Sequence, residues 1–300
     1  MVLTPQELSG GGVRGTVSFF STQGAENSDM RVPYKIAIKR RSIMYKIMSA
    51  NVLGKYERQI FEDSTTQARM KIIGELIGAE RPDSVGIQEY GSRNQKFLPM
   101  YIPPCYAAVD FDQKWISTFY NKDKFTVTDK CSLKLTTSSN QGYRFTWAVL
   151  GHKNGGLAYI HGNLHLEYKD HETRLINASE INSELTRIFN NTEYRNLPLV
   201  ITGDYNAKLE TEPDVFSAIA GKYDIRSAAL VAHSAENGQA TFHQLGKSTG
   251  AGNALDHALV NCGITEVYRH DIIKEDSCPS IVDASDHYPV IIEFTVKENI

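Results

Sequence analysis

Short apolar runs that each end in a polar cluster recur along this chain between Ile43 and Val296. Their length is that of buried β-strands, and in packed α/β domains ligands gather where loops leave the ends of strands. The most informative cluster is Ser285-Asp286-His287, which directly precedes the apolar run Tyr288–Val296. A carboxylate beside an imidazole can both approach a metal-bound phosphate and take a proton from water near neutral pH. The recurrence therefore predicts a sheet-based fold with a functional site at one end of its strands.

Apolar spacing divides the same region into helices and strands. A helix is expected to be capped by Ser64 or Asp63 and to stop at Arg81-Pro82-Asp83, and further helices are expected over Asp170–Asn190 and Pro213–Ala220. The expected strands are Ile43–Leu53, Val85–Ile87, Trp115–Tyr120, Phe125–Leu135, Tyr143–Leu150, Leu157–Leu166, Leu197–Thr202, Ala254–Val260, Val267–Ile273 and Tyr288–Val296. Strand–helix–strand units thus flank a central run of antiparallel strands. This order suggests two packed sheets with helices outside them.

Residues 1–42 differ from the rest of the chain. The stretch Leu8-Ser9-Gly10-Gly11-Gly12 is typical of a flexible linker, and the stretch Arg31–Arg41 is basic. We interpret residues 1–42 as a leader, a linker or the remnant of a preceding domain, and residues 43–300 as one catalytic domain. The leader could tether this domain to a partner or a surface. A solvated basic face before the first strand is the alternative interpretation.

Composition excludes some classes of protein. The 300 residues are 41% hydrophobic and 22% charged, which suits one large or two small globular domains with a sizeable core. A net charge of -3 argues against a protein whose main role is to coat nucleic acid. No apolar run approaches the ~20 residues that span a bilayer, and the N-terminus lacks the pattern of a signal peptide. We expect a soluble monomer and leave its compartment open, because a trimmed secreted protein would look the same.

The cysteines give little support to a metal or redox site. They are widely spaced and contain no Cys-x-x-Cys pair: Cys105, Cys131, Cys262 and Cys278. A zinc site or a redox motif is therefore disfavoured. Free thiols are the main expectation, and a Cys262–Cys278 disulfide stays open as an alternative.

The polar residues at the predicted strand ends form a consistent set. They are carboxylates, amides and two histidines, with no cysteine: Asn51, Glu89, Asn163, His165, Asp204, Asn206, Asp256, Asp286 and His287. Hard oxygen ligands of this kind suit Mg²⁺ or Mn²⁺ better than zinc. Mg²⁺ usually serves phosphoryl chemistry, in which it neutralises a phosphate oxygen and the developing negative charge. The set therefore indicates hydrolysis of a phosphoester.

The region from about Tyr45 to Val296 resembles the endonuclease/exonuclease/phosphatase superfamily, the pancreatic-deoxyribonuclease-like phosphoesterases. The matching motifs occur in the order of the family: Met48-Ser49-Ala50-Asn51-Val52-Leu53, Gly86-Ile87-Gln88-Glu89, Gly162-Asn163-Leu164-His165-Leu166, Gly203-Asp204-Tyr205-Asn206-Ala207, Leu255-Asp256-His257-Ala258-Leu259-Val260 and Ser285-Asp286-His287-Tyr288-Pro289-Val290. Each motif alone is weak, but the ordered set is specific. The resemblance implies a four-layer α/β/β/α sandwich of two packed mixed sheets flanked by helices, which agrees with the strand and helix pattern.

The resemblance also implies roles for the metal ligands and the base. Glu89 would be the principal ligand of Mg²⁺ (or Mn²⁺), with Asn51 and Asp286 near the metal. His287 would be the general base that activates water. Asp256 would hydrogen-bond to His287, fix its tautomer and raise its basicity.

The remaining roles concern the water and the phosphate. By the same resemblance Asp204 would position the nucleophilic water or a second metal, and Asn206 and Asn163 would contact the phosphate. His165 would stabilise the transition state or assist the leaving oxygen. Residues Asn163 and His165 are two apart, so both should face one side of a strand. One departure from the family pattern concerns His165. The stretch Gln113–Tyr120 lacks the acidic residue that supports the equivalent histidine in many members.

Substrate choice is left open by these motifs. A nuclease or a general phosphodiesterase is the leading hypothesis, and nucleic acid is one candidate partner. Small-molecule or lipid phosphatases, of the phosphoinositide or sphingomyelin type, are the alternative. A third hypothesis is a binding module that kept the fold and lost turnover. The loops expected to select substrate, Gly91–Pro104, Ser138–Tyr143 and Ser227–Asn253, show no basic and aromatic arrangement typical of a nucleic-acid groove.

Overall fold

A computed structural model describes residues 42–54, 62–137, 142–235, 239–247 and 253–297 of the protein. The expected leader, residues 1–42, lies outside the described residues except for Ser42. All four cysteines are described and free, so the Cys262–Cys278 disulfide is not formed. Within the described ranges no helix is both long and apolar enough to cross a membrane.

The first of two sheets brings the N-terminal and C-terminal strands together. Its strand order is β10-β12-β13-β1-β2-β4-β3. Strand β1 (Ser42–Asn51) lies antiparallel to β13 (Val290–Lys297) and parallel to β2 (Ser84–Gln88), so the sheet is mixed. The other members are β3 (Tyr106–Ala108), β4 (Ser117–Asn121), β10 (Ala232–Ala235) and β12 (Glu266–Ile272). Polar residues at the ends of β1 and β2 are thereby neighbours.

The second sheet has the strand order β5-β6-β7-β8-β11-β9. Strand β8 (Leu199–Asp204) runs parallel to β7 (Leu157–His165) and antiparallel to β11 (Asp256–Asn261). Its remaining strands are β5 (Phe125–Lys134), β6 (Arg144–His152) and β9 (Ile225–Ser227). Both sheets are therefore mixed, as expected.

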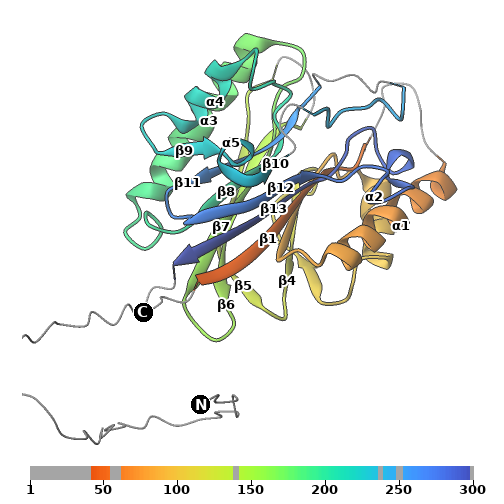
Figure 1. Ribbon diagram of the computed structural model, residues 1–300, viewed down its shortest axis with the longest axis horizontal. Coiled ribbons are helices and arrows are strands. Elements are labelled where there is room, and N and C mark those ends of the chain that lie inside the picture. Colours follow the sequence, from red (N-terminus) through yellow and green to blue (C-terminus); the bar gives the residue numbers. More distant parts are fainter. Residues whose placement is uncertain (1–41, 55–61, 138–141, 236–238, 248–252, 298–300) are drawn as a thin grey trace, which may run out of the picture. The chain divides into compact units, whose positions relative to one another are not determined.

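Helices cover the outer faces of the two sheets (Figure 1). Buried side chains of α1 (Asp63–Glu80) and α2 (Ser92–Phe97) pack on the first sheet, and those of α3 (His171–Asn190) and α4 (Pro213–Ala220) pack on the second. A separate apolar cluster fills the space between the sheets. Shorter helical segments are η1 (Leu98–Met100), α5 (Ala228–Val231) and η2 (Ile281–Asp283). The expected four-layer α/β/β/α sandwich is confirmed.

Helix starts were predicted with mixed success. Asp170 caps α3, because its side chain accepts a hydrogen bond from the Thr173 amide at 2.8 Å. The prediction that Asp63 or Ser64 caps α1 is wrong: the cap position is Glu62, which makes no side-chain cap bond. Asp63 instead forms ion pairs with Arg93 at 3.1 Å and Lys96 at 2.6 Å. These partners are about thirty residues away, so local spacing could not identify them.

Buried histidines make part of the sandwich sensitive to acid. Between the sheets His161 bonds to Ser84 Oγ at 2.8 Å and to Thr202 Oγ1 at 2.9 Å. On β12 neither ring nitrogen of buried His270 has a hydrogen-bond partner among the residues that the structure describes. Burial lowers the pKa of His161 to about 3 and that of His270 to about 4. Both imidazoles are therefore neutral in the folded protein at neutral pH.

Acidification should destabilise the fold through these two residues. Their pKa values are lower in the folded than in the unfolded protein, so the stability they contribute is lost as pH falls from about 6.5 toward 4 and 3. Between pH 7 and pH 5 each should cost about 2 kcal/mol of the free energy of unfolding. Urea unfolding of His270→Leu beside the wild type would measure the share of His270. Equal losses over that pH range in the two proteins would contradict the prediction.

Candidate active site

Three polar side chains of the second sheet lie in one row. In the strand register His165 pairs with Asp204, and Asp204 pairs with Asp256. Paired residues on neighbouring strands project from the same face of a sheet. All three are buried, and Asp204 Oδ2 lies 3.5 Å from Nε2 of His165. The row explains why residues about forty and fifty positions apart meet at one point.

The first sheet contributes a second group from the ends of β1 and β2. Asn51 is the last residue of β1, and its Nδ2 donates to Glu89 Oε1 at 3.2 Å and to Asp204 Oδ2 at 3.1 Å. Its Oδ1 accepts from the Leu53 amide at 3.1 Å. Asn51 therefore joins Glu89, at the end of β2 in the first sheet, to Asp204 in the row of the second sheet.

Glu89 occupies a tight backbone position directly after β2. Its φ is 55°, in the left-handed region that non-glycine residues seldom adopt. The Gly54 amide donates to Glu89 Oε2 at 2.9 Å, and a Cβ at residue 54 would lie 2.3 Å from the Glu89 carbonyl oxygen. Only glycine allows this close approach. The side chain of Glu89 is partly exposed, so its carboxylate is fixed by the backbone yet reachable from solvent.

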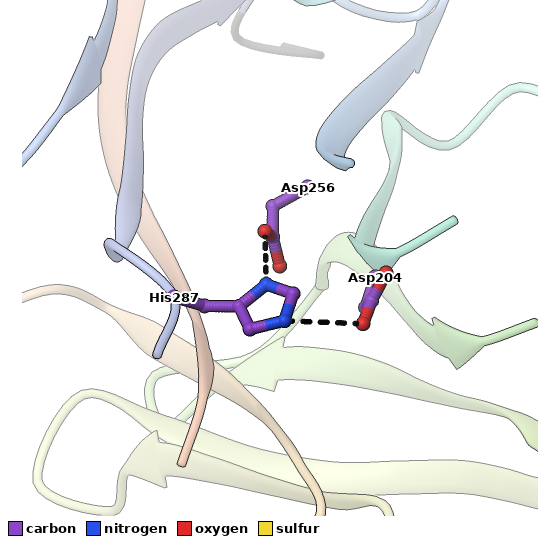
Figure 2. A group of neighbouring side chains, drawn as sticks. All are labelled: Asp204, Asp256 and His287. Atoms are coloured by element: carbon purple, nitrogen blue, oxygen red, sulfur yellow. Dashed lines mark hydrogen bonds and ion pairs between the residues drawn. The ribbon is translucent and has the colours of Figure 1, made fainter. Parts of the chain in front are cut away.

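His287 and Asp256 form the closest contact of the site (Figure 2). His287 Nδ1 lies 2.7 Å from Asp256 Oδ2, while Nε2 faces Asp204 Oδ2 at 3.8 Å. Burial alone would lower the pKa of His287, but the carboxylates of Asp256 and Asp204 raise it well above its usual value. Burial also raises the pKa of Asp204, against the opposing effect of His287 and His165. Nδ1 is thus held by one carboxylate, and Nε2 points into the site.

Asp286 lies next to Glu89 at the edge of this group. The side chain of Asp286 is buried, and burial together with the negative charge of Glu89 raises its pKa while His287 opposes the shift. The carboxylates of Glu89 and Asp286 offer hard oxygen atoms of the kind that bind Mg²⁺ or Mn²⁺. Their mutual repulsion is the charge pattern that a divalent cation relieves. Asn51 Oδ1 accepts from the Leu53 amide and keeps one further lone pair for such a cation. The donor set therefore fits the expected metal.

A second group of donor atoms also lies close together. One ligand atom each of Asp204, Asp256 and His287 lie within 4.8 Å of one another. His287 and Asp256 already satisfy each other, which favours a hydrogen-bonded pair over two separate ligands. Asp204 accepts a hydrogen bond on each carboxylate oxygen, from Asn51 Nδ2 and from the Asn206 amide, whereas Asp256 Oδ1 is buried with no hydrogen-bond partner among the described residues.

Asn163 is not brought into the site. Its Nδ2 donates to the carbonyl oxygens of Ile87 at 3.2 Å and Ser117 at 2.9 Å, and its Oδ1 accepts from Gln88 Nε2 at 2.7 Å. The side chain is fully buried between the sheets, so the expected contact with the phosphate is not supported. We interpret Asn163 as a residue that joins the two sheets.

His165 and Asn206 do lie at the site. As the sequence suggested, no described residue supports Nδ1 of His165, which is buried without a hydrogen-bond partner. Its ring packs edge-on against Tyr143, with 5.0 Å between centroids. Asn206 has a φ of 47°, its amide N–H donates to Asp204 Oδ1 at 2.9 Å, and its Nδ2 donates to the Leu166 carbonyl at 2.9 Å. The turn at Asn206 therefore orients Asp204.

One segment of the site was missed from sequence. Thr241 Oγ1 accepts from the Asp256 amide at 3.0 Å, and the Thr241 carbonyl accepts from the Tyr288 amide at 2.7 Å. Phe242 forms a β-bridge with His287, and their ring centroids are 4.9 Å apart. This segment therefore clamps both members of the His287–Asp256 pair. Its stretch lacks strand or helix periodicity, so no sequence signal marked it.

The family follows from the span of the sequence match. A sequence model described as the Endonuclease/Exonuclease/phosphatase family matches residues 48–287, a range that contains every candidate residue from Asn51 to His287. The chain belongs to the endonuclease/exonuclease/phosphatase family. Members of this family are phosphoesterase hydrolases, and the chain is an enzyme of that class.

Solved structures share the fold. A family member from Bacteroides vulgatus has a TM-score of 0.70 at 22% identity, over 85% of this chain and 100% of that one. A mannosyl-6-phosphatase from Bacteroides thetaiotaomicron VPI-5482 has a TM-score of 0.66 at 20% identity, over 83% and 99%. The catalytic domain of human Nocturnin, with bound sulfate, has a TM-score of 0.62 at 19% identity, over 86% and 97%. No curated protein matches the sequence significantly.

Proposed function

We propose that this protein hydrolyses a phosphoester bond by in-line attack of water, with Mg²⁺ or Mn²⁺ held by Glu89, Asp286 and Asn51. One observation carries the proposal. Asp256 occupies Nδ1 of His287, and the free Nε2 faces Asp204 Oδ2 at 3.8 Å among buried carboxylates. An imidazole oriented in this way is suited to take a proton from a water molecule that attacks phosphorus.

The residues of the site would have separate roles in the reaction. When bound, the cation supplies charge that neutralises a phosphate oxygen and the charge that develops on it. The neighbouring carboxylates raise the pKa of His287, so Nε2 would become a free acceptor only when a bound cation offsets their charge. His287 Nε2 would then accept the proton of the attacking water, and Asp256 would fix Nδ1–H and stabilise the resulting imidazolium. Asp204, beside Nε2, orients that water through its Oδ2 atom.

His165 and Asn206 would face the phosphate. Nε2 of His165 lies 3.5 Å from Asp204, in the same row as the base, and can donate to a phosphate oxygen or to the leaving oxygen. Asn206 uses one N–H of its Nδ2 group to hold the Leu166 carbonyl, so its contribution to the phosphate is positional or comes through the second N–H of that group.

Two substrate classes follow from this site. A phosphodiester, including nucleic acid, is the first candidate. A phosphomonoester of a small molecule is the second, and it is favoured by the similarity to a mannosyl-6-phosphatase over 99% of that chain. A net charge of -3 gives no general attraction for polyanions, so a nucleic-acid substrate would require local contacts.

Hydrolysis assays would test both the reaction and the substrate class. We expect turnover with Mg²⁺ or Mn²⁺, loss of turnover in EDTA and recovery with excess metal, because the proposed ligands alone cannot neutralise the phosphate. Bis(p-nitrophenyl) phosphate, p-nitrophenyl phosphate, plasmid DNA and mannose 6-phosphate would separate diester from monoester activity. Turnover that EDTA leaves unchanged would refute the metal-dependent mechanism.

A further inference from the structure

A buried arginine links the two loops that carry proposed metal ligands. Arg69 lies on α1 with 4% of its surface exposed. Its Nε donates to the Ala284 carbonyl at 2.8 Å, and its Nη2 donates to the Leu53 carbonyl at 3.0 Å and to the Val52 carbonyl. Ala284 precedes Asp286 by two residues, and Val52 follows Asn51. One guanidinium therefore sets the separation of these two loops.

Asn94 of α2 reaches the same loop from another helix. This side chain is 2% exposed, and its Nδ2 donates to the carbonyls of Val52 and Glu89, each at 3.2 Å. The carbonyl of Glu89 belongs to the residue with a φ of 55°. Asn94 thus ties the Glu89 backbone to the loop after Asn51.

The charge of Arg69 faces the same ligands. Burial lowers the pKa of Arg69 to about 10, and the nearby negative charges of Asp286 and Glu89 oppose that shift. Arg69 remains a cation at neutral pH. Its charge repels an incoming metal, whereas its hydrogen bonds hold the metal ligands in place, so the two effects predict opposite changes on substitution.

We propose that Arg69 and Asn94 are positioning residues of the metal site, which hold the backbone of Asn51, Glu89 and Asp286 at the spacing required by one divalent cation. The inference rests on the proposed function, because it assumes that these three residues bind the metal. Residues outside the ligand set that orient ligands typically contribute 10–100-fold in metal affinity or activity. A lysine cannot replace the guanidinium, since an ammonium group lacks the planar fork that reaches three carbonyls.

Two substitutions test the geometry while the charge stays constant. Asn94→Ala removes two backbone contacts without changing charge, and Arg69→Lys keeps the charge but loses the fork. Arg269→Lys is the control, because Arg269 is a partly exposed arginine of β12 that pairs with Asp271 and Glu293. Calorimetric titration with Mn²⁺ would give Kd, steady-state kinetics would give kcat and KM, and thermal unfolding without metal would report the fold.

We expect Kd for Mn²⁺ to weaken by about 10-fold or more in Asn94→Ala and in Arg69→Lys, with kcat reduced and Arg269→Lys unchanged. Wild-type Kd in Asn94→Ala, or wild-type or tighter Mn²⁺ binding in a folded Arg69→Lys protein, would overturn the inference. If the Arg69→Lys protein does not fold, the result for Asn94→Ala decides the test. A wild type that neither binds Mn²⁺ nor hydrolyses any phosphoester would instead refute the proposed function.

Discussion

Replacement of His287 by alanine should lower kcat by about 10²–10⁴-fold, the usual contribution of a general base. His287 and His165 both lie near Asp204, but only His287 has a second carboxylate hydrogen-bonded to its other ring nitrogen, since Nδ1 of His165 has no partner among the described residues. The effect should fall on kcat more than on KM, because the proton is transferred in the transition state and His287 is not a proposed metal ligand. Steady-state hydrolysis of bis(p-nitrophenyl) phosphate or p-nitrophenyl phosphate, whichever the wild type prefers, would measure it.

Two companion variants would make that result specific. Asp256→Asn keeps the shape of the side chain but removes the charge that stabilises the imidazolium, so it should also lower kcat. His152→Ala is the control, because His152 is at the opposite end of β6 from Arg144, the residue that pairs with His165, and its replacement should leave kcat unchanged. Thermal unfolding would show that each variant is folded. A folded His287→Ala protein with wild-type kcat would place the base elsewhere.

Much of the site was predictable because strand periodicity and strand ends are local properties. Asp204 and Asp256 were placed at strand ends from their sequence neighbourhood, and the register brings them opposite each other. The pairing of Asp256 with His287 was implied by the family resemblance, and the contact of 2.7 Å between them agrees with that expectation. The roles of these residues in catalysis remain proposals that the substitutions above would test.

The side of a strand that a residue faces could be predicted from sequence. How far the residue lies from the open end of the sandwich was harder to predict. Asn163 and His165 share one face of β7, as expected, but two residues of a strand span roughly 6.6 Å. That distance separates the open end of the sandwich from its interior. His165 reaches the row with Asp204, whereas Asn163 is bonded to Ile87, Ser117 and Gln88 between the sheets. The alternating pattern gives no information about where the opposing sheet closes over a strand.

Contacts made by distant segments were not predictable from one sequence. Arg69 lies 215 residues from Ala284 in the chain, and Thr241 reaches the Asp256 amide from a segment without periodicity. An arginine in a helix usually projects into solvent, so the residue type alone gives no reason to expect that Arg69 is buried. Arg69 is buried because it donates to carbonyl groups in the loops after Asn51 and before Asp286. Buried carbonyl groups require hydrogen-bond donors.

Substitution of Glu89 by glutamine should abolish most metal binding while leaving the fold intact. The amide keeps the size of the side chain and can still accept a hydrogen bond from the Gly54 amide, but it removes the charge of the proposed principal ligand. We expect Kd for Mn²⁺ to weaken by about 10²-fold, which corresponds to about 2.7 kcal/mol of binding free energy, and kcat/KM to fall at least as much. Calorimetric titration of Mn²⁺ and steady-state kinetics would measure the two losses.

Glu89→Gln should lose metal affinity but should not lose stability in the absence of metal. This difference distinguishes a metal ligand from a carboxylate that supports the fold. Glu89 lies near Asp286, whose pKa it raises, so removal of its charge relieves repulsion in the metal-free protein. Thermal unfolding in EDTA should therefore show Glu89→Gln at least as stable as the wild type, whereas added Mn²⁺ should stabilise only the wild type. Glu75→Gln, on the exposed face of α1, is the control and should behave as the wild type in both conditions. If Glu89→Gln unfolds earlier in EDTA and binds Mn²⁺ normally, Glu89 supports the fold and the metal is held by other residues.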